Sequence, residues 1–327
     1  MSGALSGNFP PVSVIIPLHR DNRAFRDCLA ACLALDYPDV EIIVVTDSQI
    51  GLPERARLVL TGRTGDSGPG EKRDLGMHQA HGQYLAFVDD DAAPRPDWLR
   101  SAISAFADPS IAAVAGPGLT PVESPWRERL GGAFYESWLG SGPYRYRFRP
   151  GRRRSVDDYP AYNLIVRRSA AEQVQGWGTG FYGGEDTVIC LALVEAGWTI
   201  VYDPDVVVYH RRRPVLRGHL AQVGNVGLHR GYFVKAYPKT SLRISYFLPA
   251  AGTVAFAALA ASALTKSSMR KLLLAALGGY YVAGAGLALA EGGEPVLSMA
   301  LPAVALASHL TYGIQFIRGL FTRDLHR

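Results

Sequence analysis

The sequence has few cysteines, and their spacing matches neither a disulfide-rich protein nor a zinc site. Only Cys28, Cys32 and Cys190 occur among 327 residues. An odd number of cysteines without a Cys-x-x-Cys pair argues against both kinds of protein. Residues 1–11 are small and polar and have no apolar core, so we expect no signal peptide.

Strong charge of one sign and a dinucleotide fingerprint are also missing. Lys and Arg number 34 against 29 Asp and Glu, which gives a net charge of +5. No known nucleic-acid-binding module accompanies the basic residues, so we expect no nucleic-acid partner. No Gly-x-Gly-x-x-Gly follows the first predicted strand, so the dinucleotide-binding fingerprint is absent. At 48% hydrophobic and 19% charged residues, the chain is not a disordered protein.

The chain does contain an N-terminal strand–helix–strand pattern. Residues 12–16 are an apolar run that ends at Pro17, and residues 40–45 are a second run that ends before Asp47. Between them, residues 24–35 carry apolar side chains at helical spacing. Two buried, all-apolar strands joined by a helix predict a parallel βαβ unit.

A third apolar run leads straight into three consecutive carboxylates. The strand predicted from Tyr84 is followed by Asp89, Asp90 and Asp91, and Pro94 stops its continuation. Open α/β sheets bind ligands at the carboxyl ends of their strands. Adjacent carboxylates repel one another unless a cation compensates them. Carboxylate oxygens suit Mg2+ or Mn2+ bound together with substrate phosphates. A solvated acidic turn is the alternative interpretation.

Two glycine-rich stretches precede charged helix starts. The first, 62–70, leads into Lys72 and Arg73, which either hold a phosphate or form a surface cap. The second, 176–184, leads into Glu185 and Asp186. These two acids are either ordinary partners of the helix dipole or part of a substrate cleft.

The middle of the chain contains an arginine-rich run and a strand-end histidine. Residues 143–154 hold six arginines interleaved with Tyr and Phe. An anionic membrane surface, a phosphate-bearing acceptor and a solvated loop remain open as its environment. The strand-like residues 206–209 end at His210, which is either a metal ligand or a histidine satisfied at a strand end.

The C-terminal third has the composition of a membrane domain. Residues 214–243 are a mixed, basic stretch that predicts an interfacial segment on an anionic leaflet. Three uncharged apolar stretches follow, at 244–264, 272–290 and 296–317, each long enough to cross a bilayer. The positive-inside rule favours a transmembrane hairpin of the last two, with the first, interrupted by Pro249, re-entrant or interfacial. Three full spans are the alternative.

Taken in order, these motifs resemble the family 2 glycosyltransferases of GT-A fold. The resemblance covers roughly residues 11–213, and the downstream part looks like the membrane-anchored bacterial members that build cell-surface glycans. It implies an α/β catalytic domain with a Rossmann-like mixed sheet at 1–213, an interfacial segment at 214–243 and a membrane domain with two or three transmembrane helices at 244–327. It also implies a catalytic domain on the cytoplasmic side of the inner membrane.

The resemblance implies a role for each motif residue. Thr46 stands where the family commonly has an acid, so the identity of the nucleotide stays open. The implied donor-binding residues are Pro17, Asp47, Lys72, Arg73, Asp74, Asp89 and Asp90; the implied metal ligands are Asp89, Asp91 and His210; and the implied catalytic base is Asp186, with Glu185 beside it.

The resemblance therefore implies an inverting enzyme that uses Mn2+ or Mg2+ and a nucleotide-diphosphate sugar. We expect transfer of one sugar to a lipid-linked or membrane-proximal glycan, because the chain lacks the Gln-x-x-Arg-Trp signature of processive polymerases. Transfer to polyprenyl phosphate itself is an alternative. A non-catalytic membrane scaffold of the same fold is another, and it is disfavoured because Asp89, Asp91 and Asp186 are present. A nucleotidyltransferase is disfavoured because no glycine-rich phosphate loop follows the first strand.

Overall fold

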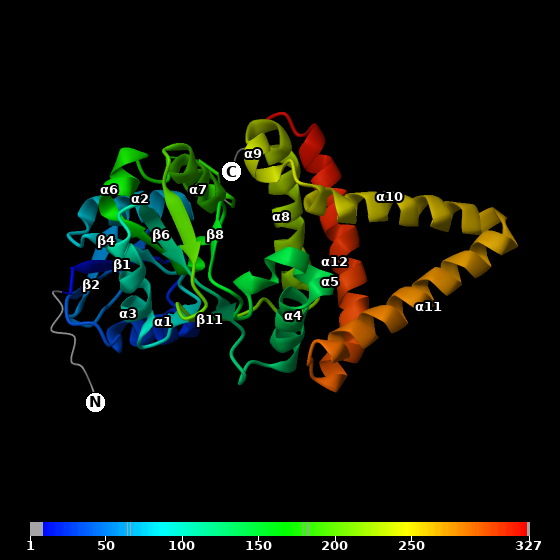
Figure 1. Cartoon of the computed structure of the whole chain (residues 1–327), viewed down its shortest axis with the longest axis horizontal. Helices are drawn as coiled ribbons and strands as arrows, with labels where there is room; N and C mark the ends of the chain where they lie inside the picture. Colours follow the sequence, from blue (N-terminus) through cyan, green and yellow to red (C-terminus); the bar gives the residue numbers. More distant parts are fainter. Residues whose placement is uncertain (1–8, 64, 66, 179, 182, 326–327) are drawn as a thin grey trace. The chain divides into compact units, whose positions relative to one another are not determined.

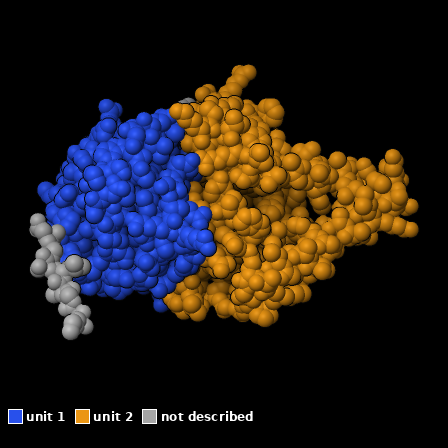
Figure 2. Space-filling model, viewed as in Figure 1, with its two compact units in different colours: residues 1–119, 150–210, 327 blue, residues 120–149, 211–326 orange. Residues whose placement is uncertain are grey.

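The chain divides into two compact units (Figure 2). The structure is a computed structural model that describes residues 9–63, 65, 67–178, 180–181 and 183–325. Unit 1 contains Met1–Leu119 and Pro150–His210, and unit 2 contains Thr120–Arg149 and Arg211–His326. Residues 120–149 therefore group with the C-terminal helices, whereas the sequence predicted one continuous domain over 1–213. Most of the segment for which we expect no signal peptide lies outside the described residues.

Unit 1 is built on an eight-stranded mixed sheet. Its strands, in spatial order, are β3 (Ala56–Leu60), β2 (Val40–Thr46), β1 (Val12–Pro17), β4 (Tyr84–Phe87), β9 (Leu164–Arg167), β6 (Ile111–Ala115), β10 (Thr199–Tyr202) and β8 (Arg154–Val156). Strands β1 to β4 run parallel, and β9 runs antiparallel to both β4 and β6. The helix α1 (Arg23–Leu33) joins β1 to β2, so the predicted parallel βαβ unit is confirmed.

A second, three-stranded sheet in unit 1 was not predicted. It contains β5 (Ala92–Pro94), β11 (Val208–His210) and β7 (Gly118–Leu119), with β11 in the middle. After the acidic triplet the chain forms the short strand β5, which ends at Pro94. Because β5 is an edge strand, the missing amide proton of Pro94 disrupts little. This small sheet fixes where the acidic triplet and His210 meet.

Helices cover both faces of the large sheet. They are α1, α2 (Pro69–Gln79), α3 (Trp98–Ile103) with its 3-10 extension η1 (Ser104–Ala107), α6 (Arg168–Gln173) and α7 (Glu185–Glu195). The strand predicted over 161–168 begins instead with a 3-10 turn, η3 (Ala161–Asn163). The Asn163 side chain is fully buried and bonds the carbonyls of Gly116 and Val206, which holds this turn out of the sheet.

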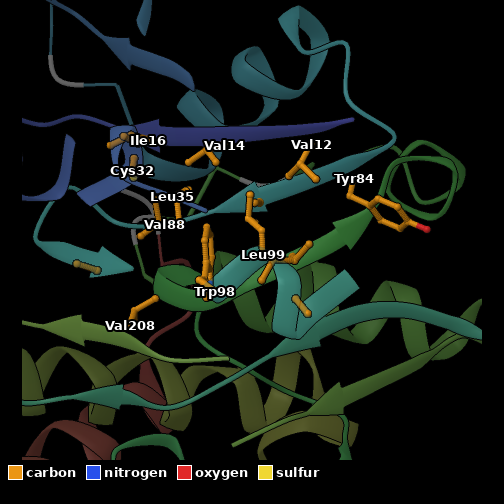
Figure 3. Close-up of a cluster of buried hydrophobic side chains, with 14 of the residues drawn as sticks. Val12, Val14, Ile16, Cys32, Leu35, Tyr84, Val88, Trp98, Leu99 and Val208 are labelled. Carbon is orange, nitrogen blue, oxygen red and sulfur yellow. The ribbon is translucent and has the colours of Figure 1, made fainter. Parts of the chain in front are cut away.

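The alternation of side chains along β1 explains the two faces. Val12, Val14 and Ile16 point into the main core beside α1 and α3, where Trp98 and Leu99 are fully buried (Figure 3). On the opposite face α2 approaches so closely that a Cβ on its Gly76 would lie 2.5 Å from Ile15. A strand that is apolar on both faces is the pattern expected of a parallel sheet covered by helices.

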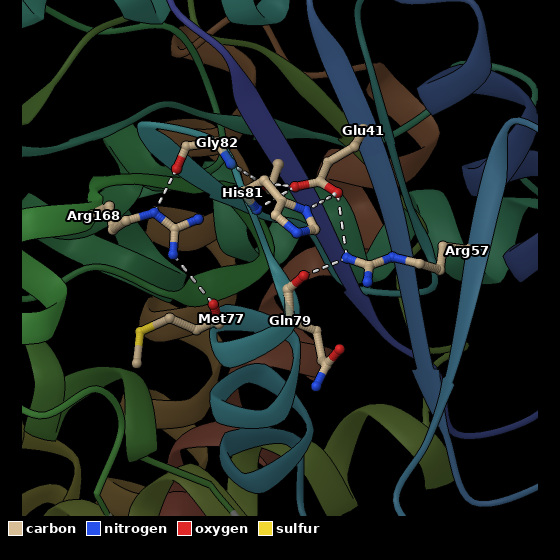
Figure 4. A network of polar contacts seen from close by, with 8 residues as sticks. Glu41, Arg57, Met77, Gln79, His81, Gly82 and Arg168 are labelled. Atoms are coloured by element: carbon tan, nitrogen blue, oxygen red, sulfur yellow. Dashed lines mark hydrogen bonds and ion pairs between the residues drawn. The ribbon is translucent and has the colours of Figure 1, made fainter.

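A polar network ties the amino ends of the first strands together (Figure 4). The Glu41 carboxylate at the start of β2 accepts hydrogen bonds from Ser13 and from the backbone amide of His81, and it pairs with Arg57 at 3.3 Å. Partial burial raises the pKa of Glu41, but these hydrogen bonds outweigh it and lower that pKa. The network lies at the strand ends opposite the acidic triplet, so it is part of the scaffold.

Unit 2 consists of helices. They are α4 (Trp126–Glu136), α5 (Trp138–Ser141), the 3-10 helix η2 (Gly142–Arg147), α8 (Arg217–Ala236), α9 (Pro238–Ser241), α10 (Ile244–Thr265), α11 (Ser267–Ala290) and α12 (Pro295–Phe321). By length and composition, α10, α11 and α12 could each cross a membrane. The interruption predicted at Pro249 is not seen, because α10 continues through it as one 22-residue helix.

The three apolar helices differ in how much of them is covered. In Figure 1, α10 and α11 extend away from α12 and meet where α10 ends and α11 begins. Within its most apolar window, 44% of α12 is buried, against 11% of α10 and 17% of α11. α8 runs parallel to α12, from a 2.9 Å His219–Ser308 contact to a Lys235–Thr322 contact. The polar helix α8 therefore shields much of α12, while α10 and α11 present apolar surface.

Candidate active site

Three potential metal ligands converge in unit 1. The ligand atoms of Asp89, Asp91 and His210 all lie within 4.8 Å of one another. The small sheet causes this, because the antiparallel register of β5 and β11 places His210 opposite Ala92, the residue after Asp91. As a result, His210 Nε2 lies 2.9 Å from Asp91 Oδ1. The ring of Tyr162 packs against the imidazole at a centroid distance of 4.7 Å and holds its plane.

The chemistry of this donor set fits a divalent cation. Two carboxylates and one imidazole offer oxygen and nitrogen ligands and leave coordination positions for phosphate oxygens or water. Asp89 and Asp91 are about one-third exposed, whereas His210 is largely buried. The group is therefore open on its acidic side, as a site that binds metal together with a substrate requires.

A buried arginine links the acidic triplet to the start of α7. The Arg73 guanidinium lies 2.6 Å from Asp89 Oδ1 and 2.8 Å from Glu185 Oε1, and its side chain is only 3% exposed. It also stacks over the Trp177 ring at 4.7 Å. Burial alone would lower the pKa of Arg73, but the two carboxylates raise it. A charged side chain therefore bridges two carboxylates that lie 96 residues apart in the sequence, with one guanidinium nitrogen on each.

A second buried cation links β2 to β1. Lys72 Nζ lies 2.7 Å from Asp47 Oδ2 and donates a 2.8 Å hydrogen bond to the carbonyl of Leu18, which follows Pro17 at the end of β1. Asp47 also accepts hydrogen bonds from the Thr61 hydroxyl and the Ser67 amide. Burial opposes these contacts, but the three hydrogen bonds hold the pKa of Asp47 well below its usual range. The predicted nucleotide pocket residues thus form one connected group.

The three carboxylates of the triplet point to three different partners. Asp89 pairs with Arg73, Asp91 contacts His210, and Asp90 accepts a 2.9 Å hydrogen bond from the backbone amide of His19. Burial and the two neighbouring carboxylates raise the pKa of Asp90 to about 6, although the His19 amide opposes this. Asp90 therefore ties the triplet to the loop after β1, a contact that the sequence did not predict.

The glycine-rich loop before α7 is fastened by carboxylates at both ends. Asp74 accepts hydrogen bonds from the amides of Trp177 at 2.7 Å and Gly178 at 3.3 Å. Glu185 accepts one from the Gly183 amide at 2.9 Å, just before the left-handed Gly184. Burial raises the pKa of Asp74. The observed partners of Asp74 are loop amides, so it shapes the site through the loop.

Asp186 lies in the first turn of α7, immediately after Glu185. Its Oδ1 accepts a 2.8 Å hydrogen bond from the Thr187 amide, as an acid at a helix start commonly does. It is only partly buried, whereas Glu185 is buried against Arg73. Glu185 is therefore the structural member of the acidic pair, and Asp186 is the more accessible one.

Sequence reasoning missed the residues that hold the site together. Asn163 accepts a 2.8 Å hydrogen bond from Trp98 and donates to two strand-end carbonyls. Tyr162 supports His210, and the Ser67 amide supports Asp47. None of these residues belongs to a local motif, and only the tertiary fold brings them to the site. No signal in a single sequence marks them.

The stretch of the chain that holds the acidic triplet, Lys72 and Arg73 matches a known family. Residues 13–175 match the model of Glycosyl transferase family 2. A pre-mycofactocin glycosyltransferase of Mycobacterium tuberculosis (strain CDC 1551 / Oshkosh) is 29% identical over 219 residues, which cover 64% of this chain and 45% of that protein. Glycosyltransferase AglE of Haloferax volcanii is 27% identical over 221 residues, covering 64% of this chain and 70% of that one. The chain thus spans less than half the length of the mycobacterial relative.

A solved structure shows the same fold. The mannosyltransferase PcManGT from Pyrobaculum calidifontis, in complex with GDP-Man and Mn2+, superposes with a TM-score of 0.60 and 21% sequence identity. The superposition covers 96% of this chain and 88% of that structure. The predicted fold class is confirmed, a GT-A-like mixed α/β domain with apolar C-terminal helices that could span a membrane. The family match, the relatives and the fold together identify this chain as a member of the family 2 glycosyltransferases.

Proposed function

We propose that this chain is a metal-dependent, inverting glycosyltransferase that moves one sugar from a nucleotide-diphosphate sugar to an acceptor at a membrane. The observation that carries the proposal is the convergence of Asp89, Asp91 and His210 at the carboxyl ends of the strands. Two further supports are the buried cations Lys72 and Arg73, which order the surrounding carboxylates.

The cation proposed for this site is Mn2+ or Mg2+, held by Asp89, Asp91 and His210. When bound, it would neutralise the charge that develops on the leaving diphosphate. Asp47 and the end of β1 at Pro17 would face the nucleoside, and Lys72 holds Asp47 in place for that contact. Arg73 keeps Asp89 oriented, since its pairing fixes one carboxylate oxygen and leaves the other available.

Asp186 is the proposed general base. The acceptor hydroxyl would transfer its proton to the Asp186 carboxylate as its oxygen bonds to the anomeric carbon and the carbon–diphosphate bond breaks. Attack opposite the leaving group inverts the anomeric configuration. A second carboxylate such as Glu185 beside the base would repel its ionised form if both were buried. Because Glu185 is paired with Arg73, that repulsion is weakened, and Glu185 acts as a positioning residue.

A membrane setting follows from three helices long and apolar enough to span one. We place the donor reaction on the cytoplasmic side of the inner membrane and propose a lipid-linked glycan as acceptor, with polyprenyl phosphate as the second candidate. The basic helices α8 and α9 support contact with an anionic membrane surface. A scaffold without activity is disfavoured, because the ion pairs that order the site are complete.

Donor binding tests this proposal. UDP-, GDP- and dTDP-sugars are added to the full chain with Mn2+, with Mg2+ or with chelator, and the melting temperature is measured. One donor class is expected to raise it only with metal, since ligand at 100 times its Kd adds about 2.7 kcal/mol of stability. Asp91→Asn should abolish this shift. Asp97→Asn, an exposed carboxylate paired with Arg95, is the matched control. A metal-independent shift, or none with any donor, would refute the proposal.

A further inference from the structure

The contacts of unit 2 distinguish the helices that cross a membrane from those that do not. Among the described residues, only α10, α11 and α12 have the length and apolar composition of a span. Residues 120–149 leave unit 1 after Leu119 and return to it at Pro150, and α8 follows soon after His210 of unit 1. None of these connecting segments is a candidate span. They therefore lie on the side of the membrane where unit 1 lies, which we call the catalytic side.

The turn that joins α11 to α12 is held by α4 and α5. Arg129 of α4 pairs with Glu294, and Arg145, just after α5, pairs with Glu291. Glu291 also accepts a 3.1 Å hydrogen bond from the backbone amide of Trp138, at the start of α5. Because α4 and α5 lie on the catalytic side, the turn and the amino end of α12 lie there too.

The carboxyl end of α12 is held by α8. Lys235, near the end of α8, donates a 2.6 Å hydrogen bond to the carbonyl of Thr322, the C-cap residue of α12. The two helices are in close contact on the way there, since a Cβ on Gly227 would lie 2.6 Å from the carbonyl oxygen of Tyr312. Both ends of α12 are thus held by segments of the catalytic side.

The exposed side of α8 is polar, which opposes a position of α12 across the bilayer. Gln222 and Asn225 are exposed on α8, one helical turn apart. Because α8 runs beside the second half of α12, a spanning α12 would carry these amides into the hydrocarbon. Each amide would cost about 4–8 kcal/mol in a medium that offers no hydrogen bond. At the membrane surface the same side chains remain in water.

α10 and α11 have the opposite kind of surface. α10 contains no charged residue, and residues 272–290 of α11 contain none either. Their side chains Val254, Leu264, Leu274 and Val282 are between 58% and 82% exposed. With 22 and 24 residues, the two helices are each about 33–36 Å long, which is enough for a hydrocarbon layer of about 30 Å. Exposed apolar helices of this length are suited to lipid.

The two helices form a hairpin that stands on α12. Near the start of α10, Phe247 packs on Phe316 of α12 at a centroid distance of 4.9 Å. In the second half of α11, the Tyr281 hydroxyl donates a 2.7 Å hydrogen bond to the Met299 carbonyl of α12. From these contacts α10 and α11 extend away from α12 and meet at Lys266, the single residue between them (Figure 1). The turn of the hairpin is therefore far from α12.

We propose that α10 and α11 form the transmembrane hairpin of this chain, with the Lys266 turn on the far side, and that α12 lies along the membrane surface with both ends on the catalytic side. The proposal rests on the membrane setting proposed above and not on the transfer reaction. Arg270 and Lys271, close to the turn, can extend their long side chains to the far surface.

This arrangement differs from the one that the positive-inside rule favours. Applied to the sequence, the rule places the acidic turn outside and makes the last two apolar stretches the hairpin. It takes no account of charge partners, whereas Glu291 and Glu294 are each paired with an arginine. The two arrangements place the turns at Lys266 and at 291–294 on opposite sides, so labelling of these turns separates them.

Cysteine labelling of the full chain in sealed membrane vesicles tests the proposal. The three native cysteines are buried, so the wild type gives the background. The single substitutions, all at exposed positions, are Glu54→Cys in unit 1, Ser268→Cys beside the hairpin turn, Pro295→Cys at the start of α12 and Arg323→Cys after its end. A maleimide that does not pass the membrane is added before or after permeabilisation, and the labelled fraction is measured by mass spectrometry.

Labelling of Glu54→Cys identifies the vesicles in which the catalytic side faces outward. In these vesicles, Pro295→Cys and Arg323→Cys are expected to be labelled as fully as Glu54→Cys. Ser268→Cys should lose its labelling and regain it after permeabilisation. Vesicles of the opposite orientation should give the reverse pattern.

Three labelling patterns would overturn the proposal. Protection of Arg323→Cys together with Ser268→Cys would show three full spans. Labelling of Ser268→Cys with protection of Pro295→Cys would show a hairpin of α11 and α12. Labelling of all four variants would show that no helix crosses. Metal-dependent donor binding is measured on the same variants, so that a failure of the transfer reaction is seen separately. Recovery of the chain in the soluble fraction without detergent would refute both the membrane setting and this arrangement.

Discussion

The two units differ in how their cationic side chains are partnered. In unit 1 the buried cations Lys72 and Arg73 have carboxylate partners at 2.6–2.8 Å. In unit 2 the basic residues from 211 to 290 occur without any acid in the same stretch. There the guanidinium of Arg212, for example, lies over the rings of Phe148 and Tyr135, at 5.1 and 5.7 Å.

This difference predicts how each unit responds to the loss of a charge. Paired charges in unit 1 hold several carboxylates at set positions before any ligand arrives, which is the preorganisation that a reaction site needs. In unit 2 several guanidinium groups lie over aromatic rings, and Arg129 and Arg145, which pair with Glu294 and Glu291, are more exposed than the buried cations of unit 1. Removing a cation from the buried pairs of unit 1 should therefore leave carboxylates unpaired and should cost more stability than removing a cation that lies over an aromatic ring in unit 2.

The largest effect is expected from Arg73→Met. It leaves Asp89 and Glu185 without their shared cation, and breaking a buried ion pair on one side typically costs about 3–5 kcal/mol. Hydrogen exchange of β1, β2 and β4 measures this loss in unit 1 alone. Arg230→Gln in unit 2 should change its own local stability by less than about 1 kcal/mol.

The double variant Arg73→Met with Glu185→Gln sharpens this prediction. Removing one of the two stranded carboxylates should recover part of the lost stability, as coupled neighbours do. Purely additive losses would mean that Arg73 stabilises unit 1 through packing on Trp177, and the contrast between the two units would fail.

The second largest effect is expected from Asp186→Asn, measured as turnover. Loss of a general base slows proton transfer by about 10²–10⁴-fold. Metal-dependent donor binding should stay unchanged, because Asp186 is not among the converging metal ligands. Glu185→Gln is the control at the neighbouring position. It should lower the stability of unit 1, because it removes an Arg73 contact, and should leave most of the turnover intact. Undiminished turnover in Asp186→Asn would remove it as the base.

The acidic triplet shows how far the sequence led to the site. The apolar run before it predicted a strand end, and the three acids predicted a metal site, which the convergence of Asp89, Asp91 and His210 supports. The three-residue strand β5 was not predictable, because so short a segment has no periodicity and is defined only by pairing with β11. Without the pairing of β5 with β11, the sequence did not show that His210 lies next to Asp91.

The division of the chain into units shows what the sequence could not reveal. Residues 120–149 lie between strands of unit 1 in the sequence, and nothing local marks them as part of unit 2. They belong there because Leu130 and Phe134 of α4 share a hydrophobic cluster with Leu301 and Val304 of α12. Contacts between segments about 170 residues apart are set by tertiary packing, which single-sequence patterns do not encode.

A smaller effect is expected from Gly227→Ala in unit 2. The added Cβ would lie 2.6 Å from the Tyr312 carbonyl oxygen, and backbone cannot move aside cheaply. Overpacking of this kind costs typically about 1–3 kcal/mol. It should raise hydrogen exchange in α8 and α12. Gly252→Ala on α10 meets nothing within 4 Å and is the control. Unchanged hydrogen exchange in α8 would show that the close contact between α8 and α12 does not hold unit 2 together.

The smallest effect is expected from Asp47→Asn, read as a function of pH. The pKa of Asp47 is held below its unfolded value, so its ionised form adds stability that is fully present above about pH 4. That stability is lost as the pH falls from about 4 toward the folded pKa. The amide oxygen of the new side chain can still accept a hydrogen bond from Lys72, so Lys72 keeps a partner. The variant should therefore be only about 1.5 kcal/mol less stable at pH 7, the low end for a hydrogen bond to a charged group.

The difference between the wild type and Asp47→Asn should therefore shrink below pH 4, as measured by hydrogen exchange of β2 and β3. Residues 211–290 of unit 2 should show no such difference over the same range. Their cations are Lys and Arg, which stay charged at every pH tested, and the stretch contains no carboxylate to protonate. His219 on α8, whose pKa burial lowers to about 4, contributes equally to the wild type and the variant. A matching difference between them in α8 would therefore mean that the loss of Asp47 also destabilises unit 2, and the contrast between the two units would fail.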